Sequence, residues 1–434
     1  MKTATLLFSF LLSLTSFVFG QQKTSPEVME AFMNKRFGMF IHWGPVSLRG
    51  TEIGWSRDRE VPKEDYDSLY KEFNPVLFDA DQWVRTAKAA GMKYLTITAR
   101  HHDGFSIWPS EFTDYDIMNT PYKKDILDAL NKACKKHGIE FCIYYSILDW
   151  YHPDYPIHSA HTKEVDPEAE MDAYVTFMKN QLKELITNYD PYMLWFDGQW
   201  ESPWTDEMGK EMYSYLKTLK PDLIINNRLG KEMAGVKNEK VDPSKIVGDY
   251  DTPEQVVGHM NMEIPWESCF TICQQWAWKP NDQMKSLEES LKILSQTIGG
   301  NGNLLLNVGP MPDGRIEMRQ IKRLEEIGDW VKSNSEAIYG TLGGPFPPTA
   351  NYATTRKGNN IYVHVLNTDV ASIELKNIPE IEILEAHTSD GTPVTIQKEN
   401  GQFKIILPSE LSGKLQYIVT LEMNSDIEQT PVIE

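Results

Sequence analysis

The sequence lacks any long apolar run beyond its first 20 residues. Within them, Lys2 precedes the apolar run Leu6 to Leu14, and a second run ends at Gly20. This arrangement is typical of a secretory signal peptide cleaved near Gly20, and it is too short for a membrane span. A retained anchor is the alternative. We expect an exported protein with no membrane contact after cleavage, in the periplasm, the medium or a lysosome, with periplasm or secretion favoured.

Basic residues are scarce relative to acidic ones. The 434-residue chain has 43 Lys and Arg against 62 Asp and Glu, a formal net charge of −19. Such a surface repels phosphate backbones, so we expect no nucleic-acid partner. An anionic polymer is disfavoured as substrate for the same reason, whereas a neutral polymer is not.

Cysteine is also scarce, with four residues and no CxxC pair. Cys269 and Cys273 lie four apart in a strand-like run, which would separate them by ~13 Å. Cys134 and Cys142 flank a helix-to-strand turn and could approach each other. The spacing fits neither a disulfide framework nor a zinc site, so isolated thiols are expected. Whether Cys134 and Cys142 are bonded is left open.

Short apolar runs alternate with amphipathic segments over residues 25–335. The runs predict eight strands, at Phe37–His42, Tyr94–Thr98, Glu140–Tyr145, Tyr192–Phe196, Asp222–Ile225, Ile246–Gly248, Phe270–Cys273 and Asn303–Asn307. Helical patterns lie between most of them, at Asp79–Ala90, Lys124–His137, Glu168–Asn188, Asp206–Leu219, Gln283–Ile298 and Glu317–Asn334. This α/β alternation predicts a (β/α)8 barrel of the TIM type. Residues 226–268 supply little helix, which leaves room for one or two missing outer helices.

The composition changes after Tyr339, where Gly343 to Pro348 form a breaker-rich boundary. The segments that follow are short, alternating and separated by turn residues: Asn360–Asn367, Ser372–Leu375, Glu380–Ala386, Thr392–Lys398, Phe403–Leu407 and Gln416–Leu421. They predict an all-β module, most simply a sandwich. We therefore expect a signal peptide at 1–20, a catalytic barrel at 21–342 and a C-terminal β-sandwich at 343–434.

Polar side chains gather where the predicted barrel strands end. Asp197 follows four apolar residues, and catalytic groups of such barrels lie at the carboxyl ends of the strands. Taken alone, Asp197 could equally cap a helix or a turn. The other strand ends, however, supply His42, Arg100, His101, His102, Asp103 and Arg228. Packing alone does not explain this set, so the sequence predicts an active site here.

Two chemistries fit these residues. Metal-dependent hydrolysis could use His42, His101 or His102, and Asp197 as ligands, although adjacent histidines in a strand point to opposite faces. Glycoside hydrolysis needs two carboxylates framed by hydrogen-bond donors and aromatic side chains. Asp197 could be one carboxylate, and residues 249–254 or Glu267 could supply the other.

The chain resembles glycoside hydrolase family 29, the α-L-fucosidases. The matching segments fall in family order and span nearly the whole barrel: Phe37–Gly44, His101–Phe105, Trp195–Gly198, Pro265–Cys269 and Gly299–Pro310. The resemblance implies a retaining enzyme without a metal or other cofactor, with Asp197 as nucleophile. It also implies that the fucose is bound or flanked by His42, Trp55, His101, His102, Tyr145, Arg228 and Trp276. Trp276 is expected against the C5 methyl group, whose burial is worth about 0.8 kcal/mol.

The acid/base residue varies in position across the family. Glu254 is our prediction, with Glu267 as the second choice, because a buried carboxylate bracing the pocket is the favoured interpretation of Glu267. Many members have a Glu immediately before the tryptophan that matches Trp55, whereas this chain has Gly54. A sugar contact made by that Glu must come from elsewhere or be missing.

These observations predict a retaining exo-α-L-fucosidase acting on fucosylated oligosaccharides or glycoconjugates. One alternative is a barrel that binds fucosylated glycans without turnover, which only Gly54 favours. The other is the metal-dependent hydrolase, which sensitivity to a chelator would reveal.

Overall fold

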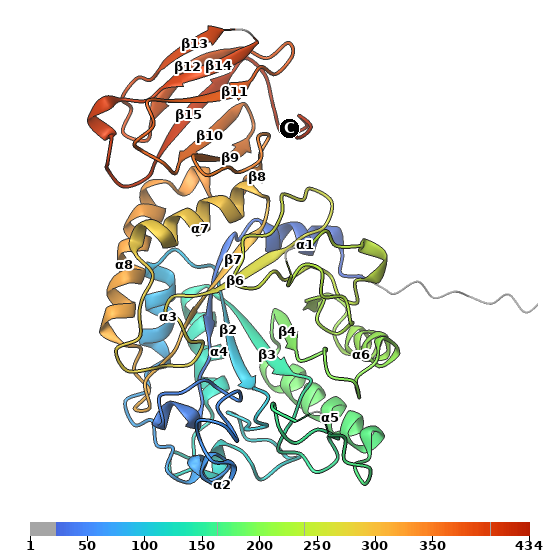
Figure 1. Cartoon of the computed structure of the whole chain (residues 1–434). Helices are drawn as coiled ribbons and strands as arrows, with labels where there is room; N and C mark the ends of the chain where they lie inside the picture. The colour runs from blue at the N-terminus through green and yellow to red at the C-terminus, as the bar shows by residue number, and fades with distance from the viewer. Residues whose placement is uncertain (1–22, 163, 238, 400) are drawn as a thin grey trace, which may run out of the picture.

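The computed structural model describes residues 23–162, 164–237, 239–399 and 401–434. The expected signal peptide at 1–20 lies outside them. Seven parallel strands form one curled sheet in the order β5-β4-β3-β2-β1-β7-β6 (Figure 1). They are β1 Phe37–Ile41, β2 Tyr94–Arg100, β3 Glu140–Ser146, β4 Met193–Asp197, β5 Ile224–Ile225, β6 Glu267–Thr271 and β7 Asn303–Val308. The barrel-type α/β fold predicted from the sequence is confirmed.

The strands are buried on both faces, as the apolar run Met193–Phe196 of β4 predicts. Successive side chains alternate between the faces. Phe40, Tyr144 and Trp195 belong to a core inside the curl of the sheet. Their neighbours Ile41 and Leu194 pack outward against the helices. The side chains that point inward are therefore the ones available to form a site at the carboxyl ends of the strands.

The predicted strand Ile246–Gly248 is wrong. Segment 247–251 lies between β5 and β6 but makes only isolated bridges, Arg228 to Val247, Asn226 to Tyr250 and Asp251 to Trp266. A 3-10 turn at Pro243–Lys245 precedes it, and Gly248 has φ +154°, outside the strand region. An irregular segment thus fills the eighth position of the barrel.

The outer layer consists of the helices α1 Pro26–Met33, α2 Lys63–Tyr66, α3 Ala80–Ala89, α4 Ile126–His137, α5 Met171–Tyr189, α6 Asp206–Leu219, α7 Leu287–Gly299 and α8 Met318–Ser333. Polar caps fix several of their starts; the Thr205 side chain accepts from Met208 N at the start of α6. Among described residues between α6 and α7 there is no α-helix, which confirms the expected gap in the outer layer. None of the helices in the described ranges is long and apolar enough to cross a membrane.

The chain after α8 forms two antiparallel sheets (Figure 1). One has the order β12-β15-β10-β9-β8 and the other β11-β14-β13. Their strands are β8 Leu342–Gly343, β9 Tyr352–Lys357, β10 Asn360–Val365, β11 Ser372–Lys376, β12 Ile383–Thr388, β13 Thr395–Glu399, β14 Gln402–Ile406 and β15 Tyr417–Met423. A separate apolar core includes residues of both sheets. β8 spans the expected boundary at residue 342 and pairs with β9.

All four cysteines are buried free thiols, as expected. Cys134 belongs to the core outside the sheet and Cys142 to the core inside it. Because the sheet lies between them, Cys134 and Cys142 are not bonded to each other.

Candidate active site

A cavity of about 260 Å³ lies at the carboxyl ends of the barrel strands. Aromatic side chains, two imidazoles and two carboxylates surround it. The lining residues are Phe40, His42, Trp55, His101, Tyr144, Trp195, Asp197, Trp200, Glu254, Cys269 and Trp276. They come from both ends of the barrel sequence, because β1 pairs with both β2 and β7 in the sheet. We call this cavity the sugar pocket.

Asp197 is the last residue of β4, and its carboxylate is held on both oxygens. Arg228 Nη1 donates to Oδ1 at 2.7 Å, and the Tyr144 hydroxyl donates to Oδ2 at 3.1 Å. His102 Nε2 lies 3.6 Å from Oδ2. Two hydrogen bonds, one of them from the charged guanidinium of Arg228, therefore fix the orientation of this carboxylate at the pocket wall.

Glu254 shares the guanidinium of Arg228 with Asp197. Arg228 Nη2 lies 2.9 Å from Glu254 Oε2. Arg228 is buried and lies over the Trp195 ring, 4.6 Å from its centroid. Although burial lowers the pKa of Arg228, the carboxylates of Asp197 and Glu254 raise it overall. One permanent cation therefore joins the two carboxylates predicted for catalysis.

Hydrogen bonds on the far side of two imidazoles define their tautomers. Asn307 donates to the Trp276 carbonyl, so its Oδ1 is the acceptor for His42 Nδ1–H, at 2.7 Å. Ser146 donates to the Leu148 carbonyl, so its hydroxyl oxygen accepts His102 Nδ1–H. Burial lowers the pKa of both His42 and His102 to about 3. Each ring is neutral, and each Nε2 is a hydrogen-bond acceptor.

His101 differs from the other two imidazoles. Its Nδ1 is buried and has no hydrogen-bond partner among the described residues. A Cβ on Gly54 would lie 3.0 Å from that nitrogen, and Gly54 has φ +69°. The glycine thus places bare backbone beside His101 where the family resemblance expects a carboxylate.

Loops that are far apart in sequence hold the aromatic side chains of the sugar pocket. Trp55 and Trp200 stack at a centroid distance of 6.0 Å and are partly exposed at the rim. Trp276 packs on His42 at 4.8 Å. Glu52, which the sequence analysis missed, accepts from the backbone N–H groups of Trp276 and Ala277 at 2.9 and 3.0 Å. This contact ties the loop bearing Trp55 to the loop bearing Trp276.

Tyr145, which the sequence analysis expected to bind or flank the sugar, does not line the sugar pocket. Its hydroxyl donates to Gln181 on the outer face of the sheet, and its ring packs against Arg100. Neighbouring residues of a strand face opposite sides, and Tyr144 is the one that points inward. Tyr144 is thus the functional candidate that the sequence analysis missed.

Glu267 lies inside the barrel, beneath the sugar pocket rather than in its wall. It is fully buried and accepts from the Tyr94 hydroxyl and from Trp195 Nε1. Burial raises its pKa to about 7. Because Trp195 lines the pocket, this contact matches the bracing interpretation of Glu267.

The histidines do not converge on one point as metal ligands do. Within the described parts of the chain, no three His, Cys, Asp or Glu side chains are grouped to hold a metal ion. Two of the imidazoles use Nδ1 for internal hydrogen bonds.

Comparisons with known proteins agree on one family. A family model described as alpha-L-fucosidase matches residues 19–336. The structure of a GH29 alpha-L-fucosidase trapped covalent intermediate, from Bacteroides thetaiotaomicron with 2-fluoro-fucosyl fluoride, has a TM-score of 0.83 and 28% identity to this chain. The match covers 94% of this chain and 98% of that one. Alpha-L-fucosidase isoenzyme 1 from Paenibacillus thiaminolyticus has a TM-score of 0.81, 31% identity, and coverage of 92% and 99%.

Among sequences, the plasma alpha-L-fucosidase of Homo sapiens is 30% identical over 339 residues, which cover 71% of this chain and 69% of that protein. Fold, pocket and sequence relationships point the same way. The chain belongs to the alpha-L-fucosidase family of glycoside hydrolases, family 29.

Proposed function

We propose that the protein is a retaining exo-α-L-fucosidase in which Asp197 is the nucleophile and Glu254 the acid/base. The observation that supports this assignment is the contact of both carboxylates with Arg228 at the wall of one pocket. Carboxyl groups lie about 5 to 5.5 Å apart in retaining glycosidases and about 6.5 to 9.5 Å apart in inverting ones. Two carboxylates that share one guanidinium are close together, which favours the retaining geometry.

In the first step an Asp197 oxygen attacks the anomeric carbon and the glycosidic C–O bond breaks. Glu254 gives its proton to the departing oxygen; its side chain is 30% exposed and borders the cavity. In the second step a water molecule gives a proton to Glu254 and displaces Asp197 from the sugar. Arg228 and Tyr144 stabilise the Asp197 carboxylate when it is free and when it departs.

The rest of the pocket suits a neutral 6-deoxy sugar. His42 Nε2 accepts a hydrogen bond from a sugar hydroxyl, because its Nδ1 is protonated and donates to Asn307. Trp276 and Phe40 offer apolar surface to the C5 methyl group. Ligand pockets usually measure about 300–1000 Å³, so a cavity of about 260 Å³ holds a single ring and favours removal of terminal residues.

The proposed substrates are terminal α-L-fucosides of oligosaccharides or glycoconjugates, which are neutral at the cleaved residue and so compatible with a net charge of −19. Export remains part of the proposal. The similarity to the plasma alpha-L-fucosidase of Homo sapiens supports it.

The test is turnover of an aryl α-L-fucoside and of fucosylated oligosaccharides, followed by ¹H NMR from the first minutes. We expect L-fucose to appear first as the α-anomer. Initial release of the β-anomer would contradict the retaining mechanism. Binding of fucosylated glycans without hydrolysis would instead support the non-catalytic barrel.

A further inference from the structure

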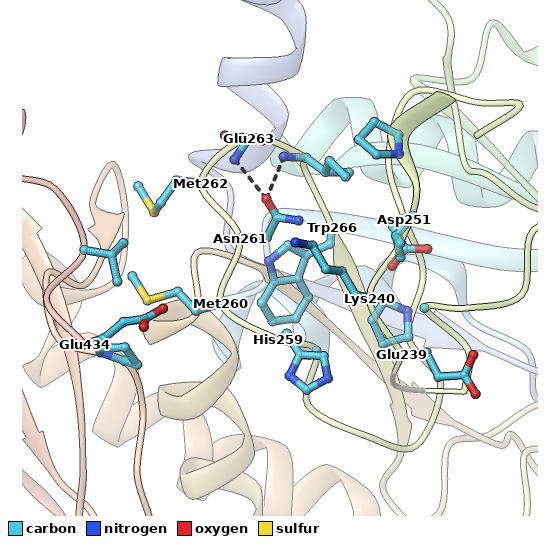
Figure 2. A pocket seen from close by; sticks show the side chains of 18 residues that line it. Glu239, Lys240, Asp251, His259, Met260, Asn261, Met262, Glu263, Trp266 and Glu434 are labelled. Atoms are coloured by element: carbon cyan, nitrogen blue, oxygen red, sulfur yellow. Dashed lines mark hydrogen bonds between the residues drawn. The ribbon is translucent and has the colours of Figure 1, made fainter. Parts of the chain in front are cut away.

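A second cavity, of about 840 Å³, shares no lining residue with the sugar pocket. It is bounded by residues 239–241, Asp251, residues 258–264, Trp266 and the C-terminal residues Val432 and Glu434, among others (Figure 2). Asp251 lies in its wall and is 4% exposed. Asp251 follows segment 247–250, and the same stretch of chain continues to Glu254 in the sugar pocket. The wall between the two cavities is therefore a single short segment.

A chain of hydrogen bonds crosses that wall from Asp251 to Arg228. Asn227 Nδ2 donates to Asp251 Oδ1 at 2.6 Å, and Thr252 Oγ1 donates to Asn227 Oδ1 at 2.8 Å. Arg228 Nε donates to Thr252 Oγ1 at 2.9 Å. The remaining two nitrogens of the guanidinium face Asp197 and Glu254.

The donors and acceptors in this chain are aligned. The Asp251 carboxylate polarises the Asn227 amide, which makes its oxygen a better acceptor for Thr252. The threonine oxygen in turn becomes a better acceptor for Arg228 Nε–H. All four side chains are buried, so the low local dielectric strengthens each bond and makes each unpaired group costly. The chain links a buried carboxylate to the cation that serves both catalytic carboxylates.

We propose that Asp251 is a positioning residue that, through Asn227 and Thr252, fixes the orientation of the Arg228 guanidinium toward Asp197 and Glu254. This inference rests on the proposed fucosidase function. Gly235 packs directly on the carboxylate, since a Cβ there would lie 2.0 Å from Asp251 Oδ2. Gly235 therefore covers part of the carboxylate on the cavity side, and the side-chain hydrogen bond of Asp251 runs to Asn227, toward the sugar pocket.

We call the hydrogen-bonded chain from Asp251 through Asn227 and Thr252 to Arg228 the relay, and single substitutions test two of its members. Asp251→Asn removes the charge and Thr252→Val removes the hydroxyl with little change of shape. Each should lower kcat on an aryl α-L-fucoside about 10-fold, with a smaller change in KM, because the relay orients the nucleophile rather than the sugar. Thr252→Ser restores the hydroxyl and should recover kcat to within about twofold. Glu263→Gln removes an exposed carboxylate from the same cavity and should match the wild type.

The double variant Asp251→Asn/Thr252→Val separates a relay from two independent packing defects. In a relay the double variant is no slower than the slower single variant, whereas independent defects multiply. Multiplying effects, a wild-type kcat for Asp251→Asn, or equal loss in Thr252→Ser and Thr252→Val would overturn the proposal. If Asp251→Asn does not fold, the comparison of kcat between Thr252→Val and Thr252→Ser still tests the relay.

The test can tell failure of the proposed function from failure of the relay. A wild-type protein without turnover would contradict the fucosidase assignment but would leave the relay untouched. Urea unfolding of the wild type, the two single variants and the double variant measures the coupling without turnover. Additive free energies of unfolding there would overturn the relay.

Discussion

The hydroxyl of Tyr144 lies 3.1 Å from Asp197 Oδ2, across paired strands β3 and β4. Burial raises the pKa of Tyr144 well above its usual value, and the charge of Asp197 raises it further. The hydroxyl is therefore protonated throughout the working range of pH. It is a permanent donor to the carboxylate that we assign as nucleophile.

Tyr144→Phe should lower kcat on an aryl α-L-fucoside roughly 10- to 100-fold, the loss expected for one hydrogen bond to a charged group. Tyr145→Phe is the matched control. It removes a hydroxyl from the adjacent residue, so it should lower the melting temperature but leave kcat within about twofold. Equal kinetic losses in the two variants would show that Tyr144 acts only through stability.

Asp197→Asn should reduce kcat at least about 1000-fold, because the amide cannot form the glycosyl ester. The melting temperature should stay close to that of the wild type, measured by calorimetry. Asp329→Asn, an exposed change on α8, serves as the control and should retain full activity. A folded Asp197→Asn protein with a normal rate would remove Asp197 from the mechanism.

Glu254→Ala should slow natural oligosaccharides far more than aryl fucosides with acidic phenols, because acid catalysis matters most for poor leaving groups. Azide should restore its second step, giving a fucosyl azide of unchanged anomeric configuration. Glu267→Ala should slow both substrate classes alike, since its carboxylate braces Trp195. Azide rescue of the Glu267 variant alone would exchange the two roles.

Glu267 should also make stability depend on pH. Its folded pKa of about 7 exceeds the unfolded value of 4.5, so the folded state binds more protons between these values. The contribution of Glu267 to stability is therefore full below pH 4.5 and is lost as the pH rises to about 7, by up to roughly 3 kcal/mol. Glu267→Gln should remove this slope. Urea unfolding at pH 4.5, 6 and 7.5 checks it, and parallel curves would contradict it.

Dialysis against a strong chelator should leave activity unchanged, since His42 and His102 use Nδ1 for internal hydrogen bonds and offer no shared ligand point. Activity is assayed before and after dialysis, with a mock-dialysed sample as control. Loss of turnover that zinc restores would favour the metal-dependent hydrolase.

A strand such as β4 could be predicted from sequence because Met193–Phe196 is a short apolar run buried on both faces. The strand predicted at Phe270–Cys273 lies instead at Glu267–Thr271, where polar residues interrupt the apolar pattern. Segment 247–251 could not be predicted, because its backbone makes only isolated bridges and its residues are held by tertiary contacts. Asp249, for example, accepts from Thr24 and Lys217, which no local pattern indicates.

In the site, polar residues at strand ends were predictable and their orientations were not. A period of two requires Tyr144 and Tyr145 to face opposite sides, yet it does not state which one faces inward. Register with Asp197 supplies that information, since Ser146 pairs with Asp197 and Tyr144 with Trp195. The tautomers of His42 and His102 depend on Asn307 and Ser146, partners visible only in three dimensions.

The contact of Glu52 with the backbone of Trp276 spans 224 residues of sequence. During synthesis the loop that carries Glu52 and Trp55 therefore emerges long before Trp276, the residue whose backbone Glu52 binds. A nascent chain that has emerged only as far as α6 holds Asp197 without Trp276 or the strand β7 that pairs with β1. The pocket is therefore complete only when the whole barrel is present. Along a series of C-terminal truncations, binding of the sugar should be lost in a single step rather than gradually.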